Sequence, residues 1–159
     1  MAWTNSKIFQ EFVAGPMFQS SGTSWTGLDS DTVKAALFNN SVTPDRTAAV
    51  ASTGYNTGTW VTANEVTDAT NWVAGGRALA SKTFGTSSGT ITFDAADLAG
   101  GGTVTISNAF GALVYDDTIT GGTVADQGVC FNYFGGAQSV TAGTFTIVWN
   151  ASGIAAFTV

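Results

Sequence analysis

The chain has 159 residues, which is one domain's worth, and its hydrophobic content of 44% argues against intrinsic disorder. Charged residues make up only 10%, so the surface must be mostly neutral and polar. The net charge is −6 and the five basic residues are scattered singly, whereas a nucleic-acid site needs clustered Lys and Arg, so nucleic acid is not an expected partner.

The N-terminus carries the only good helix signal. Four apolar residues recur there at helical spacing: Ile8, Phe9, Phe12 and Val13. With a cap at Asn5 or Ser6 and a stop at Gly15-Pro16, this spacing predicts a short helix over residues 6–14. A helix of this length is not stable alone, so it must dock on its own sheet, which is the more frequent case, or on a partner.

The next segment, residues 17–30, is rich in Ser, Gly and Thr and is predicted to be a loop or an extended arm, with Trp25 as one of its anchors. The predicted organisation is therefore an N-terminal helix and arm over residues 1–30, followed by one β domain over residues 31–159. The Ser/Gly-rich composition favours an arm that becomes ordered on assembly.

The middle of the chain alternates strand signals with turns. Residues 31–40 are predicted to form a strand whose Val33, Ala35 and Leu37 share a face, and residues 41–58 are turn material. Thr90–Phe93 is a further alternating strand.

The C-terminal third has the clearest alternation. Phe145, Ile147 and Trp149 fall on one side of a strand, and Val104 and Ile106 do the same in an earlier one, with threonines on the opposite side. Counting such runs gives eight or nine short strands. The predicted fold class is all-β: a compact antiparallel β-sandwich or barrel-like domain with a short N-terminal helix.

The sequence offers little for catalysis. No histidine is present, which excludes Ser-His-Asp and Cys-His arrangements and the usual zinc sites, and the lone Cys130 lies in an apolar strand as an inert thiol. The acids Asp94 and Asp97 share a loop, and Asp116 and Asp117 end a strand, where the two adjacent side chains face opposite ways. We expect no enzyme activity, no cofactor and no metal.

Aromatic side chains in the loop-rich middle admit three interpretations. Tyr55, Trp60 and Trp72 could stack on sugars, anchor a protein interface, or pack in the core, and core packing of at least two of them is the more frequent outcome. The predicted candidates for partner binding are Ile8, Phe9, Phe12, Trp25, Trp60 and Trp72.

Five stretches together resemble a family of small proteins of tailed bacteriophages that infect actinobacteria. They are Asp31–Asp45, Gly58–Val61 with Asn64–Val66, Gly75–Thr83, Phe110–Thr118 and Ala125–Ile154. The family is associated with virion structural proteins of the head, usually described as capsid decoration or minor capsid proteins. These stretches are strand ends, turns and alternating core positions, so the resemblance implies a family and suggests a role, without bringing functional residues.

The resemblance implies a protein that decorates and cements the capsid by binding the major capsid protein on the outer surface of the assembled shell.

 The expected assembly state is a small homo-oligomer. No run is apolar and long enough to cross a bilayer, no signal peptide is seen, and the cysteine usage suits a reducing compartment, so we expect no membrane partner and assembly in the host cytoplasm before residence on the virion. The alternatives are a tail or head–tail connector component, or a module that binds glycans through Trp60, Trp72 or Tyr55.

Overall fold

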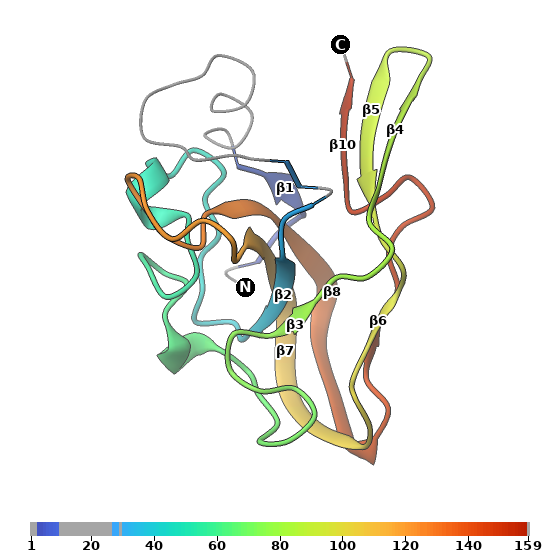
Figure 1. The fold of residues 1–159 in the computed structure, drawn as a ribbon. Coiled ribbons are helices and arrows are strands. Elements are labelled where there is room, and N and C mark those ends of the chain that lie inside the picture. Colours follow the sequence, from blue (N-terminus) through green and yellow to red (C-terminus); the bar gives the residue numbers. More distant parts are fainter. Residues whose placement is uncertain (1–2, 10–26, 29, 159) are drawn as a thin grey trace.

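A computed structural model describes residues 3–9, 27–28 and 30–158 of the chain (Figure 1). It confirms the all-β prediction, because all strand pairs that it defines are antiparallel and its helical content is limited to two short 3-10 turns, η1 (Val50–Ser52) and η2 (Thr62–Asn64). Within this described part, no helix has the length and apolar character needed to span a membrane.

The largest unit is a five-stranded sheet in the order β1-β8-β7-β2-β3. Its strands are β1 (Lys7–Ile8), β8 (Gly128–Gly143), β7 (Val104–Asp116), β2 (Val33–Phe38) and β3 (Arg77–Ala78). The long pair β7 and β8 forms its centre and curves through the body of the molecule (Figure 1).

Two smaller sheets complete the fold. One is three-stranded, in the order β10-β5-β4, and is built from β4 (Thr83–Ser87), β5 (Thr90–Asp94) and β10 (Ala155–Thr158). The other pairs β6 (Leu98–Ala99) with β9 (Thr146–Ile147). The three-stranded sheet stands beside the central sheet and extends beyond it as a projection (Figure 1).

The central sheet is buried on both faces, and each face has its own core. In β2, Val33, Ala35 and Leu37 pack into one core, as predicted, while Ala36 and Phe38 pack into the other. Successive strand residues point to opposite faces, so a strand that is apolar at almost every position serves two cores at once. The segment between β2 and β3 covers the face of Phe38.

The strands β7 and β8 are longer than the short runs predicted from the sequence. Their register shifts at four places, including between Ile106 and Ala109, where Asn108 takes a positive φ of 58°. Bulges of this kind let one strand bend without ending. The polar and glycine residues that looked like strand ends are therefore bulges inside continuous strands.

The N-terminal helix is not shown. Lys7–Ile8 is a strand that pairs with Phe131 and Cys130 of β8, and the Phe9 amide donates to the Val129 carbonyl oxygen at 3.1 Å. Only four apolar residues supported the helix prediction, so the local preference for a helix was weak. Hydrogen bonding to the edge of the central sheet outweighs this preference. The remainder of the predicted helix and the arm, residues 10–26, lie outside the described residues.

Two glycines of the central sheet receive the rings of the N-terminal segment. A Cβ added at Gly111 would lie 2.5 Å from the Trp3 ring, and one added at Gly128 would lie 2.5 Å from the Phe9 ring. Both rings are fully buried. Trp3 and Phe9 are thus part of the β domain's core, although the sequence assigned them to a separate N-terminal unit.

We predict that Gly111→Ala destabilises the fold by about 1–3 kcal/mol, since the added methyl group meets both the Trp3 ring and the Asn132 backbone oxygen. Gly121→Ala is the matched control, because a Cβ there meets nothing within 4 Å. Urea denaturation measures the free energy of unfolding of both variants. Equal midpoints for the two variants would contradict the docking of Trp3 on β7.

Candidate functional site

The aromatic residues predicted as partner anchors lie mostly in the interior. Phe9, Trp60 and Trp72 are buried, with at most 1% of each residue exposed. Ile8 is half-buried against the first core. Phe12 and Trp25 lie outside the described residues. The interpretation of Trp60 and Trp72 as core residues is confirmed. Neither side chain is exposed, so neither is placed to anchor a partner at the surface.

Trp60 is held by a cluster of rings on the second face of the central sheet. Its ring centroid lies 5.8 Å from Trp3, 6.1 Å from Phe9 and 5.2 Å from Phe38, all in edge-to-face arrangements. Such geometry brings the positive edge of one ring to the negative face of the next. Because the cluster joins the N-terminus, β2 and the loop region, Trp60 stabilises the fold and presents no ring face to a ligand.

Tyr55 is also occupied within the chain. Its ring stacks on Tyr115 with centroids 5.0 Å apart, and its hydroxyl donates to Glu65 Oε2 at 2.7 Å. The other oxygen of Glu65 accepts the Gly75 amide at 2.9 Å. Burial raises the pKa of Glu65 and, together with the neighbouring carboxylate, that of Tyr55. These contacts join two turns, and they leave at most one face of Tyr55 for stacking on a sugar.

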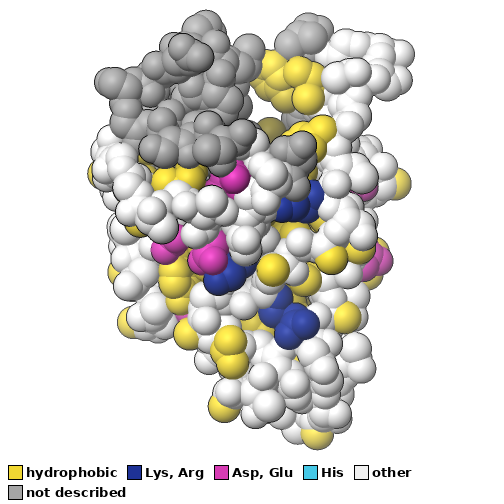
Figure 2. Space-filling view, in the orientation of Figure 1, with side chains coloured by type: hydrophobic (Ala, Val, Ile, Leu, Met, Phe, Trp, Pro, Cys, Tyr) yellow, Lys and Arg dark blue, Asp and Glu magenta, His cyan; other side chains and the backbone are white. Residues whose placement is uncertain are grey.

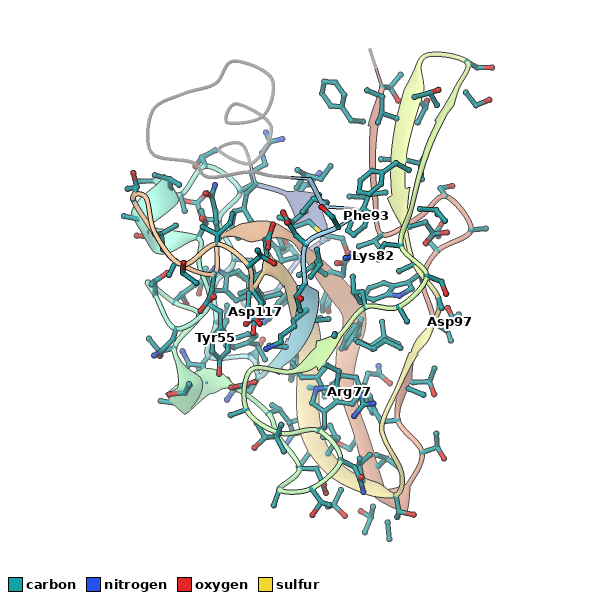
Figure 3. All side chains as sticks on the ribbon, viewed as in Figure 1. Tyr55, Arg77, Lys82, Phe93, Asp97 and Asp117 are labelled. Carbon is teal, nitrogen blue, oxygen red and sulfur yellow. The ribbon has the colours of Figure 1, made fainter. Side chains whose placement is uncertain are left out.

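Asp97 binds the C-terminal segment, while Asp94, predicted to share its loop, is the last residue of β5. Asp97 accepts the Trp149 amide at 3.0 Å, while the indole of Trp149 donates to the Ala96 carbonyl oxygen at 3.1 Å. Figure 3 shows Asp97 beside β6, away from Asp117. The two pairs of acids that the sequence singled out therefore belong to different parts of the molecule, and Asp97 has a structural partner.

Asp116 and Asp117 face opposite ways, as predicted. Asp117 lies towards solvent and forms an ion pair with Lys34 at 2.8 Å. Asp116 is fully buried, accepts the Thr118 amide at 2.9 Å and lies beside the buried Asp31. Burial, with a further contribution from Asp31, raises the pKa of Asp116 to about 6. One proton shared between two adjacent carboxyls is the arrangement that such burial favours.

The described residues contain no group of three or more His, Cys, Asp or Glu side chains placed to hold a metal ion. Cys130 is buried, and burial raises the pKa of its thiol to about 12, so it stays protonated at neutral pH. Charged side chains are few on the face shown in Figure 2, where neutral polar surface predominates.

An apolar surface is open on the three-stranded sheet. The pairing of Phe84 with Phe93, and of Phe93 with Ala155, places these residues on one face together with Thr86, Ile91 and Phe157. Phe84 is 47% exposed and Ile91 is 44% exposed. We call this surface the apolar face of the small sheet. Asp94 is the one charged residue in the three strands, and it belongs to the opposite face.

Phe93 joins this face to the core. Its ring is buried at the base of β5 (Figure 3) and stacks on Phe84 with centroids 5.0 Å apart. The sequence predicted the strand Thr90–Phe93 and missed its role, because alternation shows that residues share a face and does not show whether another layer covers that face. The absence of charge in β4 and β10 was the available signal.

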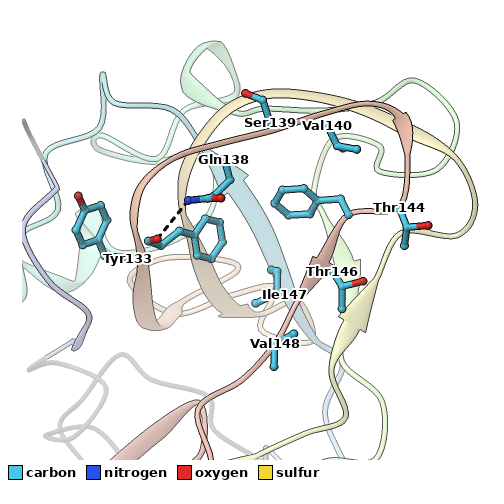
Figure 4. Close-up of a pocket in the computed structure, with 10 residues that line it drawn as sticks. Tyr133, Gln138, Ser139, Val140, Thr144, Thr146, Ile147 and Val148 are labelled. Atoms are coloured by element: carbon cyan, nitrogen blue, oxygen red, sulfur yellow. Dashed lines mark hydrogen bonds between the residues drawn. The ribbon is translucent and has the colours of Figure 1, made fainter.

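A second open feature is a cleft of about 530 Å³ between β8 and β9 (Figure 4). Tyr133, Phe134 and Gln138 line one wall, and Thr146 and Val148 belong to the other. The Gln138 amide donates to the Phe134 carbonyl oxygen at 3.4 Å, which holds this bend of β8. The cleft is lined by neutral residues, so it lacks the convergent charges of a catalytic site.

The buried carboxyl pair predicts a pH dependence of stability. The folded pKa of Asp116, about 6, lies above its unfolded value, so the folded state binds the extra proton and stability falls as pH rises through this window. Relative to Asp116→Asn, the wild-type free energy of unfolding should fall by about 2–3 kcal/mol between pH 4 and pH 7. Denaturant titrations of both proteins across this range measure the difference.

Asp68 contributes a pH dependence of stability opposite in sign to that of Asp116, and Asp68→Asn should remove it. The Asp68 carboxylate accepts three backbone amides, from Thr70, Asn71 and Thr105, and these lower its pKa. Its contribution to stability is therefore present above the unfolded pKa and is lost as pH falls.

A wild-type protein whose stability relative to Asp116→Asn does not change with pH would contradict the buried pair of Asp116 and Asp31.

Comparison of the chain with protein-family models, with curated proteins and with solved structures finds no match.

Proposed function

We propose that the chain is a structural protein of a bacteriophage virion that decorates the capsid and stabilises it by binding the major capsid protein. Two observations support this proposal. The sequence resembles phage head proteins over residues 31–154, and the fold presents an uncharged apolar face on a projecting sheet. Of the two, the open apolar face carries the proposal, because it is a binding surface that the single chain leaves unfilled.

Exposed apolar side chains gathered on one face indicate an interaction site. Phe84 and Ile91 lie on neighbouring strands, and their exposed halves would be buried by a docked partner. Full burial of such side chains contributes about 1.5–3 kcal/mol each, so burial of the remaining half contributes about 1 kcal/mol each. That is a modest affinity per copy.

A modest affinity suits a protein that acts in many copies. A protein that binds the assembled shell and not its dissociated subunits shifts the equilibrium towards the shell by mass action. Each copy contributes little, and the contributions add over the shell. The neutral surface fits this role, since hydroxyl and amide groups cost less to bury than charges.

The finer architecture, a compact β-sandwich or barrel, remains part of the proposal. Its support is the way in which two sheets contribute to one core: Leu98 and Ile147 of the two-stranded sheet pack with Val104 and Ile106 of the central sheet. The proposed location is the capsid surface, after assembly in the host cytoplasm. A tail or head–tail connector role is the alternative that the same apolar face would serve.

The test is binding of the purified chain to capsid shells that lack it. We expect co-sedimentation with the shells and a higher temperature of shell disruption. Ile91→Lys should abolish both effects, because it places a charge in the centre of the apolar face. Ala156→Lys is the matched control: it adds the same charge in β10, at an exposed position on the opposite face of the same sheet.

Electron cryo-microscopy of intact particles then locates the copies. Density distributed over the shell, with each copy contacting capsid subunits through the small sheet, is the expected result. Copies confined to one vertex or to the tail would overturn capsid decoration in favour of the connector role. Equal binding of the Ile91→Lys and Ala156→Lys variants would remove the apolar face from the proposal.

A further inference from the structure

The strand β4 leaves one edge of the small sheet open. It pairs with β5 on one side, and it forms the end of the sheet order β10-β5-β4 on the other. All five of its residues are exposed, and a Cβ added at Gly85 would meet nothing within 4 Å. An open edge is a row of backbone donors and acceptors ready to pair with another strand.

Natural monomers protect such edges, and β4 lacks the usual protection. Its sequence, Thr-Phe-Gly-Thr-Ser, has no lysine, no proline and no charge, and its pairing with β5 is continuous without a bulge. Charged residues, prolines and bulges are the features that block edge-to-edge pairing. Their absence over the full length of β4 indicates that this edge takes a partner strand.

The hairpin turn defines which backbone groups point outward. Ser87 pairs with Thr90 across Ser88 and Gly89, whose φ angles of 49° and 77° are those of a type I′ turn. The pair beside such a turn exchanges both hydrogen bonds, and the pattern alternates along the ladder. The amide and carbonyl groups of Phe84 and Thr86 are therefore directed to the open edge.

This pattern is complementary to itself. In an antiparallel pair centred on Gly85, Phe84 of one copy lies opposite Thr86 of the other, and both residues direct their backbone groups to the shared edge. Four hydrogen bonds form, two for each Phe84–Thr86 pair. The side chains of both residues belong to the apolar face, so pairing in this register keeps that face continuous across the two copies.

The distribution of charge permits a second copy at this edge. Each chain carries a net charge of −6, so two copies repel one another unless they meet through a neutral surface. The strand β4 has no charged residue, and the single acid of the sheet, Asp94, pairs with Thr83 at its base. The open edge is thus a place where copies can approach without bringing acids together.

We propose that two copies of the chain form a twofold dimer through antiparallel pairing of β4 about Gly85, which joins their three-stranded sheets into one. This dimer deepens the expectation of a homo-oligomer by naming its interface. It does not depend on capsid attachment, because it is a property of the purified chain in solution.

Sedimentation velocity of the full chain tests the dimer. We expect a mass of twice 16.2 kDa for the wild type and a single-chain mass for Thr86→Pro, which removes an outward amide and is tolerated at a sheet edge. Thr86→Val is the matched control, since it retains the amide and the side-chain shape, and it should remain dimeric. Circular dichroism verifies that both variants are folded.

Cysteine cross-linking tests the register independently. In the proposed dimer the two Gly85 Cα atoms form a non-hydrogen-bonded pair about 4.5 Å apart, within the range of a disulfide. Gly85→Cys should form a covalent dimer under mild oxidation. Ser87→Cys should not, because the two copies of that residue lie about 13 Å apart along the strands. The native Cys130 is buried and does not compete.

The results separate this proposal from the proposed function. A wild-type chain that sediments as a single copy, a Thr86→Pro variant that remains dimeric, or equal cross-linking at positions 85 and 87 would each overturn the dimer. A single-copy chain that still binds shells would overturn the dimer and leave capsid decoration standing. A β4 dimer that binds no shell would overturn capsid decoration and leave the dimer standing.

Discussion

The structure depends on the long antiparallel pairing of β7 with β8. These two strands cross the whole molecule, and their side chains supply both cores, with Val114 and Cys130 on one face and Leu113 and Phe131 on the other. A sheet buried on both faces needs cover on both, and the chain provides it from opposite ends. The N-terminal residues and the loops after β2 cover one face, and the C-terminal strands cover the other.

That constraint explains why so few polar side chains are available for chemistry. Loops that cover a core must satisfy their own backbone groups, because an unpaired buried donor or acceptor is costly. Asp68, Asp97 and Asp116 each accept backbone amides, and Glu65 joins Tyr55 to Gly75. Asp97 and Asp116, two of the acids that the sequence analysis singled out, thus connect loops to strands through backbone hydrogen bonds. The small sheet is different, because only its base is joined to a core.

The sequence predicted the fold class and several core faces, and it failed where tertiary context decides. The sets Val33, Ala35, Leu37 and Phe145, Ile147, Trp149 were assigned correctly, since strict alternation reports directly on a shared face. Ile8 and Phe9 were assigned to a helix because a few apolar positions fit either period, and the pairing partner Val129 lies far along the chain. Phe84 was not singled out at all, because its exposure depends on which layers the fold leaves uncovered.

The small sheet offers two surfaces that do not compete. Its apolar face lies perpendicular to its open edge, so pairing along β4 leaves Phe84 and Ile91 of both copies accessible on one continuous face. Under the two proposals, a dimer would therefore meet the shell with two linked binding surfaces. Linked sites raise the effective concentration of the second contact, so overall attachment can exceed the affinity of either site by orders of magnitude. A modest affinity per apolar face is then sufficient for stable attachment, without any further contact from the body of the protein.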